Sequence, residues 1–147
     1  MGTLVVTRWH DNWLEELGDD IAGQDPPLEV WVILDEGAIR RNIGGNAVMR
    51  HQLEHLINAS RWPNVTVQVL AFECGAHAGL TGPFAILEFP GRTDPDIAYT
   101  ESVGGMIYLE KDRDVRSCSE AFDRMRAAAL SPGASVELIE RVLHDLR

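Results

Sequence analysis

The chain has 147 residues, 45% of them hydrophobic, which is enough for one domain with its own core. Its net charge of -10 would repel a phosphate backbone, and no stripe of Lys and Arg offsets it, so we expect no direct contact with nucleic acid. No apolar run reaches the ~18 residues of a membrane span, and the two cysteines form no CxxC pair, so we expect a cytoplasmic protein without membrane contact or thiolate zinc site.

The N-terminal half predicts helices alternating with strands. A first helix begins at Asp11 and ends before the Gly and Pro residues of 23–27. Residues 28–34 form a nearly continuous apolar run, which is typical of a central strand covered on both faces. A helix capped by Asn46 follows, and residues 65–69 then alternate between valine and polar residues, which predicts a strand with one more polar face. Four apolar residues recur at helical spacing after the cap: Met49, Leu53, Leu56 and Ile57.

The C-terminal half predicts a meander and then helices. Residues 84–89, 97–101 and 106–110 are short runs separated by turn residues, which indicates antiparallel strands. Two helices follow, the second starting at Ser131-Pro132. The pattern as a whole predicts one α+β domain over residues 1–147. Its mostly antiparallel sheet of about five strands would pack against helices and end in a C-terminal helical hairpin.

Three pairs of polar residues invite a chemical interpretation. Asp35-Glu36, close to Arg40-Arg41, fits a helix start with acids in its first turn and a salt bridge behind it better than a catalytic carboxylate. Cys74 and His77 resemble a thiolate-imidazole pair, but no orienting residue or oxyanion motif accompanies them. We therefore favour a small buried cysteine and a loop histidine bonded to backbone.

The strongest metal motif is His51-Gln52-Leu53-Glu54-His55, which has the H-x-x-E-H spacing of inverted zinc peptidases. The apolar residues of the same helix claim its buried face, so both histidines should flank that face towards solvent. No downstream carboxylate has a spacing that identifies it as a third ligand. We expect neither a metal nor another cofactor.

Five segments together carry a family resemblance: LDEGAIRRNIGG, VMRHQLEHL, PNVTVQVLAF, GAHAGLTGPF and AALSPGASVELIERV. In this order they resemble a domain of unknown function that follows an XRE-type helix-turn-helix in antitoxin-like regulators of actinomycetes. The sequence departs from that pattern at Asn42 and Ala71, where the family usually has Pro. The helix-turn-helix itself is missing, so the resemblance implies a stand-alone effector domain that binds something. It supplies no catalytic residues.

The residues best placed for a site are large apolar side chains near predicted turns, which can enclose an apolar pocket with polar tips. A cofactor-free cyclase that folds a polyene polyketide for an intramolecular [4+2] or [6+4] cycloaddition would need only such a pocket. The alternative is a non-enzymatic regulatory domain that binds a small ligand or a small partner protein, and a homodimer is possible in either case. For the cyclase, the catalytic candidates are His77, Tyr99 and Tyr108. The substrate-binding candidates are Trp31, Met49, Trp62, Phe72, Phe84 and Met106.

Overall fold

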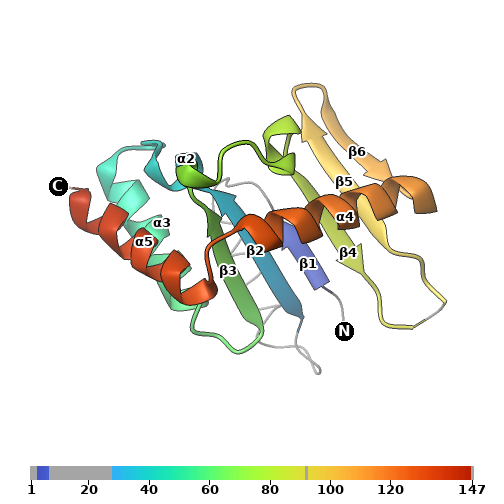
Figure 1. The fold of residues 1–147 in the computed structure, drawn as a ribbon, viewed down its shortest axis with the longest axis horizontal. Coiled ribbons are helices and arrows are strands. Elements are labelled where there is room, and N and C mark those ends of the chain that lie inside the picture. The colour runs from blue at the N-terminus through green and yellow to red at the C-terminus, as the bar shows by residue number, and fades with distance from the viewer. Residues whose placement is uncertain (1–2, 7–27, 92, 147) are drawn as a thin grey trace.

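A mixed six-stranded sheet forms the centre of the fold (Figure 1), in the order β3-β2-β1-β4-β5-β6. The computed structural model describes residues 3–6, 28–91 and 93–146. β1, β2 and β3 run parallel, and β4, β5 and β6 add to β1 in antiparallel fashion. The strands are β1 (Thr3–Val6), β2 (Glu29–Asp35), β3 (Val65–Leu70), β4 (Phe84–Glu88), β5 (Ile97–Ser102) and β6 (Gly105–Leu109). The predicted α+β class with a mostly antiparallel sheet is confirmed, and β1 is a strand that the sequence analysis did not predict.

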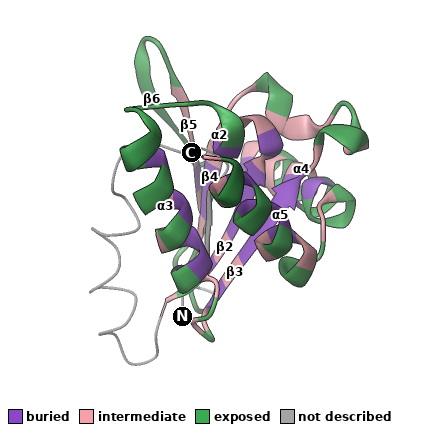
Figure 2. Ribbon diagram, turned by 90° about the vertical axis from the view of Figure 1, so that its left-hand side faces the viewer, coloured by how far each residue is buried: buried purple, intermediate pink, exposed green. Residues whose placement is uncertain are grey.

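The helices lie on both faces of this sheet and at one of its edges (Figures 1 and 2). α3 covers one face of β2 and β3, α4 crosses the opposite face, and α5 lies beside the outer edge of β3. The two predicted C-terminal helices are therefore present, and they cover different parts of the sheet. The helices are α2 (Glu36–Arg40), α3 (Asn46–Ala59), α4 (Asp112–Ala128) and α5 (Pro132–Asp145), with the short 3-10 turns η1 (Phe72–Cys74) and η2 (Ala78–Thr81).

Two apolar clusters fill the space between the sheet and these helices. On the α3 side, alternate residues of β2, among them Val32 and Leu34, pack with residues of β3, α3 and α5. On the α4 side, Ile33 packs with residues of β3, β4, β5 and α4. Because both Val32 and Ile33 are fully buried, the prediction of a strand covered on both faces is confirmed.

One local prediction was wrong. Gly45, with a φ of 92°, precedes the first turn of α3 in place of the predicted cap Asn46, which is the first helical residue. On the predicted more polar face of β3, Thr66 is half-buried and Gln68 is only 6% exposed. Its amide accepts from Trp31 Nε1 (2.8 Å) and donates to the Leu130 carbonyl (2.9 Å), so this polar side chain keeps its hydrogen bonds inside the core.

The outer edge of β3 is closed by the start of α5. The Val69 amide donates to Ser135 Oγ (2.9 Å), and the Val69 carbonyl accepts from the Leu130 amide (2.9 Å). Ser131 caps α5 by accepting from the Ala134 amide, as the sequence predicted. These bonds occupy main-chain groups that an edge strand would otherwise expose. The first predicted helix, from Asp11, falls outside the described residues.

Candidate functional site

Two carboxylates at the end of β2 hold the loop that follows β3. Asp35 Oδ1 accepts from the Gly37 amide (2.7 Å) and so caps α2. Glu36 is buried, pairs with Arg40 (2.7 Å) and accepts from the Phe72 amide (2.7 Å). The predicted helix start with a salt bridge behind it is confirmed, and the same acids also position the loop.

His77, a predicted catalytic residue, is bonded to the first of these two carboxylates. Its Nε2 lies 2.8 Å from Asp35 Oδ2, and its side chain is 5% exposed. The expectation of a backbone partner was wrong, because the partner is a carboxylate 42 positions away. His77 Nδ1 is buried and has no hydrogen-bond partner in the described part of the chain. Cys74 was predicted to be a small buried cysteine, but it is half-buried, and its thiol lies 3.6 Å from the Gly75 carbonyl.

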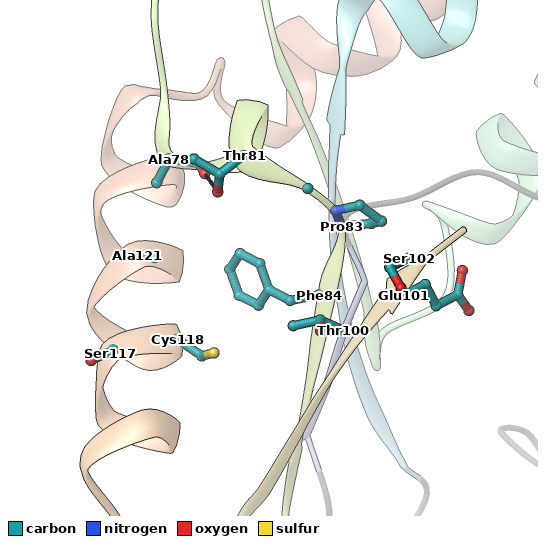
Figure 3. Close-up of a pocket in the computed structure, with 11 residues that line it drawn as sticks. Ala78, Thr81, Pro83, Phe84, Thr100, Glu101, Ser102, Ser117, Cys118 and Ala121 are labelled. Carbon is teal, nitrogen blue, oxygen red and sulfur yellow. Dashed lines mark hydrogen bonds between the residues drawn. The ribbon is translucent and has the colours of Figure 1, made fainter. Parts of the chain in front are cut away.

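A cavity of about 390 Å³ opens beside this loop, between η2, α4 and the ends of β4 and β5 (Figure 3). Phe84 and Cys118 point into it from opposite sides, and Thr100 lies next to Phe84. Burial raises the pKa of the Cys118 thiol above its ordinary value, and the nearby Asp114 carboxylate raises it further. Cys118 is therefore a protonated thiol at neutral pH and a poor nucleophile. The cavity is large enough for a small organic molecule, but the cysteine that lines it is not an activated nucleophile.

Trp31, a predicted substrate-binding residue, is part of the packing against α4. Its ring meets Phe122 edge to face, with centroids 6.1 Å apart, and the Arg126 guanidinium lies 4.9 Å above it. With Nε1 bonded to Gln68, the half-buried indole has its polar atom paired and contacts Phe122 and Arg126 within the protein. Trp31 therefore packs against the apolar cluster on the α4 side.

Tyr99 and Tyr108 lie on the other face of the sheet from Phe84. Phe84 pairs with Thr100, and Tyr99 pairs with Tyr108, so strand alternation places the two tyrosines opposite the α4 side. Their ring centroids are 6.0 Å apart. Burial raises the pKa of Tyr99, as do the neighbouring Glu101 carboxylate and Tyr108, so Tyr99 is a neutral phenol.

The structure therefore does not gather the predicted site residues into one pocket. His77 is on the η2 loop, Phe84 lines the cavity, and Trp62 packs against the cluster on the α3 side. Met49 is buried in α3, and Phe72 is 60% exposed in η1. Tyr99, Tyr108 and Met106 do come together, on strands β5 and β6. This last group is the candidate site.

Among the residues that the structure describes, the outer strand of this group has no neighbouring strand on its far side and forms an open edge of the sheet. β6 is the last strand in the order, and three successive residues in it are exposed: Met106 by 48%, Ile107 by 54% and Tyr108 by 62%. Met106 and Tyr108 lie on the Tyr99 face, and Ile107 lies on the α4 face. We call residues 97–109 the β5–β6 ribbon. The turn at its tip adds Val103, which is fully exposed.

The two histidines of the H-x-x-E-H motif take no part in a metal site in the described ranges. His51 is exposed, as predicted, whereas His55 is half-buried. Within residues 3–6, 28–91 and 93–146, no group of three or more His, Cys, Asp or Glu side chains is placed to hold a metal ion. No helix in those ranges is long and apolar enough to cross a bilayer.

Comparison with known families gives one result. The model of a family described as a domain of unknown function, DUF5753, matches residues 19–141, which is most of the chain. A search of curated proteins found no match.

Proposed function

The chain belongs to the DUF5753 family, and from this premise we propose that it is a non-enzymatic regulatory domain that binds a small partner protein. The resemblance to the effector half of XRE-type regulators of actinomycetes supports this role, because an effector domain acts by binding. Two free cysteines favour a cytoplasmic setting, where thiols stay reduced. The partner would occupy the β5–β6 ribbon.

The exposed apolar edge at β6 carries this proposal. Edge strands of soluble proteins are usually short, charged or covered, because an open apolar edge pairs with other chains. Here the β3 edge is covered by α5, whereas β6 exposes Met106, Ile107 and Tyr108 in a row. An exposed apolar patch of this kind is typical of a protein interaction site.

The predicted cyclase finds less support in the geometry. A pericyclic reaction without a cofactor needs a hollow, water-excluding pocket between sheet and helices. In the described part of the chain that space is filled by the two apolar clusters, and the cavity beside Phe84 is open to solvent. The candidate His77 lies on the loop before η2, away from the Tyr99 and Tyr108 pair, so the three catalytic candidates do not line one pocket. The cyclase stays a prediction.

Affinity capture with a matched surface control tests the proposed function. The tagged chain is exposed to an extract of the organism that encodes it, and retained proteins are identified by mass spectrometry and then purified. We expect one small protein in stoichiometric amount. The double variant Met106→Ser/Tyr108→Ser should weaken its binding at least about tenfold, because buried aromatic and Met side chains dominate such interfaces.

The control is Ile43→Ser/Val48→Ser, which removes two apolar side chains of similar exposure, 40% and 42%, before and within α3. This variant should bind like the unaltered chain. Equal binding by both double variants, or retention of no protein at all, would contradict the proposed function.

A further inference from the structure

The main-chain groups on the outer side of β6 can be assigned from the register of the hairpin. Ser102 and Gly105 pair across the two-residue turn Val103-Gly104, and such a turn is closed by a hydrogen-bonded pair. Hydrogen-bonded and non-hydrogen-bonded pairs then alternate along the strands. Ile107 therefore bonds to β5, while the amides and carbonyls of Met106 and Tyr108 point away from the sheet.

These outward groups form a template for a seventh strand. Each of Met106 and Tyr108 presents an N–H and a C=O at the spacing that an extended chain requires. Their side chains on one face and Ile107 on the other would contact the residues of the added strand above and below the sheet. Both faces of that strand must therefore be partly apolar.

Charge decides which chain this edge accepts. Glu110 follows the last residue of β6 and is exposed, so a carboxylate lies at one end of the apolar row. The whole chain carries a net charge of -10. A second copy would bring the same acidic surface and repel, whereas a basic segment would be attracted.

We infer that the partner binds by adding an extended segment to the outer edge of β6. The segment has apolar residues on both faces and Lys or Arg near the end that lies beside Glu110. This inference rests on the proposed function and specifies how its partner is recognised. Main-chain bonds to Met106 and Tyr108 give the affinity, and Glu110 together with the net charge of -10 selects for a basic segment.

Hydrogen exchange provides the direct test, with the ¹⁵N-labelled chain and the partner purified after capture. In the free chain, the Met106 and Tyr108 amides should exchange fast and the Ile107 amide slowly, because only the latter has a bond to β5. In the complex, the Met106 and Tyr108 amides should slow at least about tenfold, since each gains a bonded partner. Unchanged exchange at both amides in a complex that does form would overturn the inference and leave the proposed function standing.

Two variants at Tyr108 separate the main-chain bond from the side chain. Tyr108→Ala keeps the outward N–H, whereas Tyr108→Pro removes it without breaking a bond to β5. We expect Tyr108→Pro to bind about tenfold more weakly than Tyr108→Ala, the effect of one lost hydrogen bond with an unpaired acceptor. Equal affinities would contradict strand addition, and the exchange experiment does not depend on the folding of the proline variant.

The choice of a basic segment has its own control. Glu110→Lys should weaken binding and reduce its salt dependence, and Glu137→Lys, the same change on exposed α5, should do neither. If the Met106 and Tyr108 amides become protected in the free chain at high concentration, the occupant is a second copy and the inferred partner is wrong. If the capture retains no protein, the proposed function fails and this inference fails with it.

Discussion

Asp35 serves two donors with its two oxygens, and the sequence revealed only one of these roles. The position of Asp35-Glu36 after an apolar run predicted a helix start, and the cap on Gly37 confirms it. The bond to His77 joins residues 42 positions apart, so no local sequence pattern predicts it. Local chemistry was thus predictable at this residue, and the tertiary contact was not.

Replacing Asp35 should show that both oxygens contribute to stability. Asp35→Asn keeps one oxygen for the Gly37 amide but presents an amide N–H to His77 Nε2 in place of a carboxylate oxygen, so we expect a loss of about 1 kcal/mol in the free energy of unfolding from the weaker, uncharged bond. Asp35→Ala loses both bonds and should cost about 2 kcal/mol. Urea denaturation measures both values, with Asp145→Asn on α5 as an exposed control. If Asp35→Ala is no less stable than Asp35→Asn, the two bonds of this side chain contribute nothing.

At the scale of elements, periodicity predicted most of the strands and helices. The meander β4, β5, β6 and the apolar faces of α3 and α4 lie where alternation and helical spacing placed them. β1 was not predicted because a run of four residues is too short for its alternation to be recognised. The burial of Gln68 on the more polar face of β3 could not be predicted, because its partners, Trp31 and Leu130, belong to segments distant in the sequence.

Ser135 is the residue on which the closure of the β3 edge depends. It is fully buried, and its hydroxyl accepts from the Val69 amide. Ser135→Ala leaves that amide buried and unpaired, so we expect a loss of about 2 kcal/mol in the free energy of unfolding, together with faster exchange of the Val69 amide. Ser117→Ala, on the exposed side of α4, should cost less than about 0.5 kcal/mol. Equal losses in the two variants would mean that the hydroxyl does not close the edge.

At the scale of the whole molecule, the predicted site residues do not share one pocket. The position of each residue along its strand determines which face of the sheet its side chain is on. Phe84 and Tyr99 are both large and both near turns, which is all that the sequence shows. Their register through β4 and β5 puts them on opposite faces of one sheet. Tyr99, Met106 and Tyr108 come together because they lie in one hairpin with their side chains on the same face of the sheet. The open edge that they share emerged only when the strand order placed β6 last.

The same edge should control self-association once charge no longer keeps copies apart. At neutral pH the net charge of -10 opposes pairing of two β6 edges, but near the sequence pI of about 4.8 this repulsion vanishes. Light scattering should then report a mass above the 16.3 kDa of one chain. Tyr108→Lys should suppress this rise, since a charge on an edge strand blocks pairing, whereas Ile43→Lys, with the same change in net charge, should not. Equal suppression by both variants would assign the effect to net charge alone and contradict the role of the β6 edge.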